Sequence, residues 1–161
     1  MRTAALWTLI LLLGITVQKV LISGLMFTNF KPDLILLIVV SAGLLGGKDT
    51  GLGVGFFAGL VQDLASGNVL GLNIFSKMAV GFLGGFLESR VFKENVFLPV
   101  FMAVAATFLN GLIICIFVYV LGYAPNLWLF ISNQFVPSAV VNLIIAIPLH
   151  QAIYRLIYKM K

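Results

Sequence analysis

The chain has 161 residues, of which 61% are hydrophobic and only 9% charged, and its formal net charge is +5. A soluble domain carries roughly a quarter charged residues, so this composition excludes a protein that folds in water and predicts a single integral membrane domain over residues 1–161. The basic residues stand singly in short connections and form no basic face interleaved with aromatic residues, which argues against a nucleic-acid partner.

Six apolar segments are expected to form a bundle of short transmembrane helices. The first follows Arg2 and resembles a secretory signal, but no small-residue cleavage site closes it, so we interpret it as an uncleaved span. The second begins at Pro32-Asp33, which is typical of a helix N-terminus. Pro148 is expected to kink or end the last span. In chain order, the predicted spans are 4–26, 33–47, 51–65, 72–87, 96–121 and 127–149.

The second, third and fourth spans are short for a hydrocarbon core of roughly 30 Å. They could cross a thinned or protein-covered part of the bilayer. Alternatively, the second and third could form a re-entrant hairpin with Lys48-Asp49 at its tip. With both termini in the cytoplasm, seven basic residues lie inside and only Lys31 outside, and this asymmetry favours six spans.

Glycine recurs every four residues between Gly43 and Gly59, and the same period then reaches a carboxylate, Asp63. Residues four apart share one face of a helix, and in lipid small residues let two helix backbones approach closely. We therefore expect the third span to lie at the centre of the bundle. The residues predicted to pack against another helix or a partner are Gly51, Gly55, Gly59, Gly81, Gly84 and Gly85.

Three charged residues fall inside predicted spans, namely Asp63, Lys19 and Lys77, all at a similar depth below the outer surface. A carboxylate beside a lysine reduces the cost of burying either charge, so the three are a candidate intramembrane polar site that opens outward. The alternative is that both lysines extend to the headgroups while Asp63 caps the turn that follows it. The residues leave both interpretations open.

No set of residues at helical spacing indicates catalysis, a metal or a cofactor. His150 has no second histidine or cysteine near it, and Cys115 is expected to be an apolar filler. Asn110, Gln134 and Asn142 are more typical of interhelical hydrogen bonds than of chemistry. The prediction is a protein that is not an enzyme and holds no cofactor, with a basic tail that lies against membrane lipid.

The segment from Lys31 to Gly71 resembles the MreD family of rod shape-determining membrane proteins. The most specific part is Gly-Phe-x-x-Gly-Leu-x-x-Asp, which ends at Asp63, with Ser-Gly and Leu-Gly following it. Length, number of spans and basic tail also fit that family. The family-motif residues are Pro32, Phe56, Leu60, Gly67, Gly71, Pro137 and Asn142.

The resemblance implies a function in the elongation of bacterial cells. Members of the family are non-enzymatic scaffolds that bind the single-span protein MreC. Together the two connect MreB filaments to a RodA-type glycosyltransferase and a class B penicillin-binding protein. The fold is similar to that of the substrate-binding subunits of energy-coupling-factor transporters. The alternative function is therefore a vitamin-binding transporter subunit, which would require a concave site lined by convergent polar groups.

Overall fold

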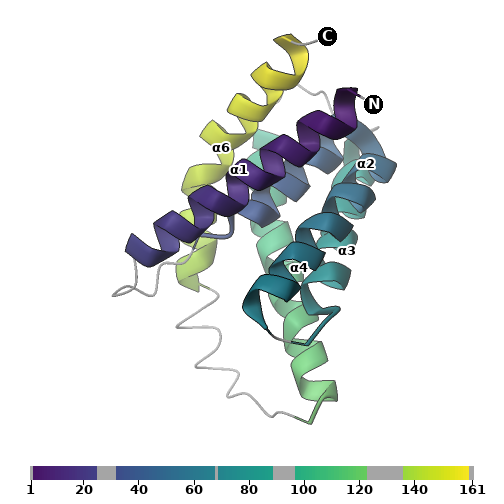
Figure 1. The fold of residues 1–161 in the computed structure, drawn as a ribbon, viewed down its shortest axis with the longest axis vertical. Helices are drawn as coiled ribbons and strands as arrows, with labels where there is room; N and C mark the ends of the chain where they lie inside the picture. The colour runs from purple at the N-terminus through teal and green to yellow at the C-terminus, as the bar shows by residue number, and fades with distance from the viewer. Residues whose placement is uncertain (1, 25–31, 68, 89–96, 123–135, 160–161) are drawn as a thin grey trace.

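The computed structural model describes residues 2–24, 32–67, 69–88, 97–122 and 136–159, and all regular secondary structure within them is helical. The elements are α1 (Arg2–Gly24), α2 (Leu34–Ser66), α3 (Leu72–Glu88), α4 (Phe97–Val120) and α6 (Val136–Lys159). This confirms the predicted all-α class. Figure 1 shows that α1 begins and α6 ends at the same end of the molecule.

α2 folds back on itself at Gly47. That residue has φ 82° and ψ −177°, a conformation that glycine adopts far more readily than other residues. A Cβ on Gly51 would lie 3.0 Å from the Cα of Gly43, although residues eight apart in an unbroken helix are separated by about 12 Å. The element is therefore a helical hairpin. Its first arm comprises residues 34–46 and its second arm residues 48–66, so the reversal occurs at the boundary that the sequence predicted between two spans.

The first arm forms the centre of the molecule. Every residue from Leu34 to Leu45 is buried, as is typical of a helix that is apolar on all sides. α2 contacts each of α1, α3, α4 and α6. The expectation that residues 51–65 would be central was wrong, because the second arm buries its glycine face while Phe57 and Leu64 are 60% and 66% exposed.

Pro148 was predicted to kink or end the last span, and it does not end it, because it lies inside α6. Side chains beyond the proline, His150 and Ile153, are buried, and the Nδ1 of His150 lies 3.1 Å from the Oγ of Ser41 in the first arm. Packing on the far side of the proline thus holds the helix together despite the missing donor. The start of the predicted span, residues 127–135, lies outside the described residues.

Within the described residues, three helices are long and apolar enough to cross a membrane: Leu34–Ser66, Pro99–Val120 and Val136–Ile157. Ala5–Val20 and Leu72–Leu87 are shorter apolar helices. At 1.5 Å per residue the first arm of α2 is roughly 20 Å long and the second arm roughly 28 Å. The outward faces of α1, α3 and α4 carry large apolar side chains such as Leu13, Phe75 and Phe101, which suits contact with lipid.

Candidate functional site

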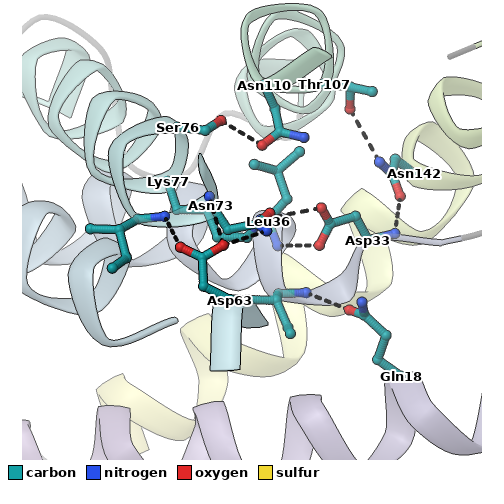
Figure 2. A network of polar contacts seen from close by, with 12 residues as sticks. Gln18, Asp33, Leu36, Asp63, Asn73, Ser76, Lys77, Thr107, Asn110 and Asn142 are labelled. Atoms are coloured by element: carbon teal, nitrogen blue, oxygen red, sulfur yellow. Dashed lines mark hydrogen bonds and ion pairs between the residues drawn. The ribbon is translucent and has the colours of Figure 1, made fainter. Parts of the chain in front are cut away.

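Asp63 lies near the end of the second arm and is 1% exposed. Its Oδ1 accepts hydrogen bonds from the backbone N and side-chain Nδ2 of Asn73, at 3.0 and 2.8 Å. Its Oδ2 accepts from the backbone N of Gly71 and Ile74, at 2.8 and 3.3 Å. The first N–H groups of a helix lack partners within it, and the helix dipole favours a negative charge beside them. Asp63 therefore caps the N-terminus of α3 from a neighbouring helix (Figure 2).

The two glycines that follow Asp63 shape the connection between the second arm and α3. Gly67 has φ 64° and ends α2 in the left-handed conformation, and Gly71 has φ 110° just before α3 begins. These angles disfavour residues with a Cβ, whereas glycine adopts them without steric cost. They place the backbone N of Gly71 on the carboxylate of Asp63, so the motif spacing of an aspartate and two glycines encodes this cap.

Lys77 is completely buried, one turn beyond Asn73 on α3. Its Nζ lies 3.5 Å from the Oδ2 of Asp33 and 3.3 Å from the Oδ1 of Asn73. Asp33 in turn caps α2, because its Oδ1 accepts from the backbone N of Leu36 at 2.9 Å. A buried charge is tolerated when it is both paired and hydrogen-bonded. Lys77 and Asn73 together join the two carboxylates that cap two different helices.

The contacts continue from Asp33 into α6 and α4. The backbone N of Asp33 donates to the Oδ1 of Asn142 at 2.9 Å, and the Nδ2 of Asn142 donates to the Oγ1 of Thr107 at 3.2 Å. Figure 2 shows this chain of contacts running across the bundle. We refer to the six linked residues as the buried polar network: Asp33, Asp63, Asn73, Lys77, Thr107 and Asn142.

Two further hydrogen bonds flank the network. Ser76 of α3 donates to Asn110 of α4, and the backbone N of Ile35 donates to the Oε1 of Gln18 in α1 at 3.0 Å. Each of the five described helices is thus held by a polar contact, and those of α2 lie at the ends of its two arms away from the fold-back at Gly47. Each interhelical hydrogen bond of this kind contributes only modestly to stability, but together these bonds fix which helix faces meet.

The glycines of the second arm pack against the backbone of α3. A Cβ on Gly55 would lie 2.5 Å from the carbonyl oxygen of Lys77, and one on Gly59 would lie 2.4 Å from the Cα of Ile74. Gly51 and Gly81 face each other, with a Cβ on either only 2.1 Å from the other's carbonyl oxygen. No side chain fits at these positions without moving a backbone, so glycine sets the distance between the helices.

The glycines of α3 serve the same contact from the other side. A Cβ on Gly85 would lie 2.4 Å from the backbone N of Lys48 and one on Gly84 would lie 3.4 Å from the carbonyl oxygen of Val40. α3 therefore lies against both arms of the α2 hairpin. The six glycines predicted for helix packing all contact this chain's own helices.

The structure brings together two of the three predicted intramembrane charges. Asp63 and Lys77 meet through Asn73, whereas Lys19 is exposed on α1 and makes no ion pair or hydrogen bond with the described residues. Of the motif residues, Pro32 and Asn142 are buried, Leu60 and Pro137 are half-buried, and Phe56 is exposed.

Sequence reasoning missed three members of the network: Asp33, Asn73 and Thr107. Asp33 was recognised only as a helix start. The pattern Asn73-x-x-x-Lys77 places an amide and an ammonium one turn apart on the same helix face, and this spacing could have drawn attention to Asn73. Thr107 carries no such indication, because its hydroxyl also bonds the carbonyl of Ala103 in its own helix at 2.7 Å.

The polar groups of the network bond to one another and offer little free capacity for chemistry. Asp63 already accepts four hydrogen bonds, and the Lys77 ammonium is fully enclosed. In the part of the chain that the structure describes, no three His, Cys, Asp or Glu side chains lie close enough together to hold a metal ion. The arrangement is suited to fixing helices in place.

The model of the family described as rod shape-determining protein MreD matches residues 1–160, which confirms the resemblance seen in the motif between Gly51 and Gly71. No curated protein and no solved structure matches the chain.

Proposed function

This chain belongs to the MreD family of rod shape-determining membrane proteins, and from that premise we propose that it is a non-catalytic scaffold of the bacterial elongation machinery. In this proposal the chain binds an MreC-like single-span protein within the membrane. The pair then helps to couple MreB filaments to a RodA-type glycosyltransferase and its class B penicillin-binding protein.

The main support for the proposal is that the charged groups of the buried polar network bond to one another within the chain. Its carboxylates and its lysine are bonded within the chain, which leaves apolar helix faces as the main surfaces available to a partner. A vitamin-binding subunit would need several polar groups converging on an open cavity. Here Asp33, Asp63 and Lys77 converge on one another instead, so the scaffold has more support than the transporter subunit.

We further propose six membrane crossings with both termini in the cytoplasm, in a fold similar to that of energy-coupling-factor substrate-binding subunits. The fold-back at Gly47 supports counting α2 as two crossings. Lys48, beside the fold-back, is exposed, and Arg155 is exposed in the last turns of α6. α6 ends at the end of the molecule where α1 begins (Figure 1). Basic residues at one end are typical of a cytoplasmic face.

Cysteine labelling tests the topology in a Cys115→Ser background. A Lys48→Cys variant should react with a membrane-impermeant maleimide only in inside-out vesicles, as should a Lys93→Cys variant, whereas Asn126→Cys should react in intact cells. Labelling of Lys48→Cys from outside would establish the re-entrant hairpin in place of six crossings.

Co-purification tests the function. The tagged chain is co-expressed with an MreC-like protein and, in parallel, with the same protein carrying an unrelated membrane span. A stable complex with the first and none with the second is the expected result. Native mass spectrometry of the same samples searches for a retained vitamin, and a bound vitamin with no partner would overturn the scaffold proposal.

A further inference from the structure

A groove lies between α1 and the second arm of α2. Its volume is about 440 Å³ and its walls are predominantly apolar. It runs along the first half of α1 and along most of the second arm, starting beside the fold-back at Gly47. Leu12 of α1 and Asp49, Gly53 and Phe57 of the second arm are among the residues that line it.

Gly53, in the floor of this groove, differs from its neighbouring glycines in the space available to a side chain. A Cβ on Gly53 would meet nothing within 4 Å, whereas one on Gly51 or Gly55, two residues away on either side, would collide with the backbone of α3. Gly53 is thus a half-buried helix position with open space where a side chain would be. Glycine in the interior of a helix costs about 1 kcal/mol relative to alanine, so its place in the floor of a groove suggests close approach by another backbone.

The groove also has a charge at one end. Asp49 is exposed at the fold-back and makes no hydrogen bond or ion pair with the described residues. In the proposed topology this end faces the cytoplasm. A membrane-spanning helix carries its Lys and Arg residues at its cytoplasmic border, so a partner helix that occupied the groove would bring a positive charge to this carboxylate.

We propose that the groove is the docking site for the membrane-spanning helix of a single-span partner. In this assignment the partner helix crosses Gly53 closely, places an apolar side chain between Leu12 and Phe57, and pairs a basic residue with Asp49. The proposal rests on the proposed function and specifies where on the chain that partner binds.

A phospholipid is the competing occupant, and two observations favour a helix. An acyl chain does not require a glycine in the floor of its groove, whereas close contact between helices in membranes depends on small residues. The carboxylate of Asp49 also repels the phosphate of a lipid headgroup, while it attracts the ammonium or guanidinium group at the border of a helix.

The test compares two leucine substitutions in the second arm. Gly53→Leu fills the groove without entering the α2–α3 contact, and Ala65→Leu adds similar bulk at an exposed position that does not line the groove. We expect Gly53→Leu to reduce the yield of co-purified MreC-like partner at least about tenfold, which corresponds to ~1.4 kcal/mol of binding. Ala65→Leu should leave the yield unchanged, and both variants should elute as monodisperse protein.

Crosslinking provides a second measurement that does not depend on a disruptive variant. In a Cys115→Ser background, Leu12→Cys should form a disulfide with cysteines placed along the partner's membrane span. Phe108→Cys on the outward face of α4 is the matched control and should form none. An Asp49→Lys variant should lose partner, and a change of the partner's border lysines or arginines to glutamate should restore it.

The outcomes separate this proposal from the function on which it rests. If the parent chain binds the partner and Gly53→Leu binds it equally well, the groove is wrong and the scaffold stands. Loss of a bound phospholipid in Gly53→Leu with an unchanged partner yield would assign the groove to lipid. If the parent chain binds no partner, both proposals fail.

Discussion

A methyl group added at Gly55 should destabilise the protein, and the same methyl group added at Gly53 should not. On Gly55 the new Cβ would lie 2.5 Å from the carbonyl oxygen and 2.8 Å from the carbonyl carbon of Lys77, and 3.0 Å from the Cα of Met78. All three are backbone atoms of α3, so no side-chain rotation relieves the contact. α3 would have to move by about 1 Å to reach ordinary van der Waals distance, and overpacking of this kind costs about 1–3 kcal/mol.

Gly53→Ala is the matched control, because a Cβ there meets nothing within 4 Å. Replacing glycine by alanine in a helix is worth up to about 1 kcal/mol in stability. Gly53→Ala should therefore be as stable as the parent or more so, while Gly55→Ala should be less stable.

The difference is measured as the free energy of unfolding of the purified protein in detergent micelles, by titration with a denaturing detergent and circular dichroism. Intramembrane cysteine pairs across α2 and α3 would report whether the helices have separated. If Gly55→Ala and Gly53→Ala are equally stable, the α2–α3 contact is not set by glycine and the packing argument is refuted.

Three further predictions concern the buried polar network. Lys77→Met leaves the partly exposed Asp33 carboxylate without its cation and should cost about 1–3 kcal/mol. Lys77→Met combined with Asp33→Asn should recover part of that loss, and unfolding of the single and double variants in detergent measures the coupling. Asp63→Ala removes the acceptor for the first N–H groups of α3 and should cost at least about 1–3 kcal/mol, with faster hydrogen exchange confined to the start of that helix. Gly71→Ala forces a Cβ into φ 110° and should cost about 1–2 kcal/mol. The ring of Phe75 would be the nearest contact of this Cβ, at 3.4 Å, so its resonances should shift in aromatic NMR spectra.

The glycine period was the most informative feature of the sequence, although it does not mark one continuous strip. Gly51, Gly55 and Gly59 contact α3 as their spacing predicted, but Gly47 sits at the same period and reverses the chain. Gly67 ends the arm in the left-handed region. Period four alone cannot separate these functions, because a glycine that permits close approach and a glycine that permits positive φ are identical in sequence.

The fold class and the approximate helix boundaries could be predicted because they follow from local composition. Which helices touch could not, since that depends on contacts between distant residues. Asp33 and Lys77 are far apart in the sequence, and their ion pair exists only because the first arm runs parallel to α3. Lys19 was predicted to lie at a similar depth to Lys77, yet it is exposed on α1 while Lys77 is buried. The residue pattern predicts that a charge falls within a helix but not the direction in which its side chain faces.

One end of the molecule is closed by polar contacts and the other contains an open groove. This difference affects how the protein could bind a partner. At the polar end, Asp63 and Asp33 satisfy helix termini and Gln18 fixes α1 to the first arm. At the fold-back end, α1 and the second arm leave an open groove of about 440 Å³ beside Gly53, whereas the contact between α2 and α3 is close enough to exclude a methyl group. Rigid polar contacts at one end would keep the groove in its open shape before a partner binds. Binding of a partner helix would then not include the entropy cost of ordering the groove.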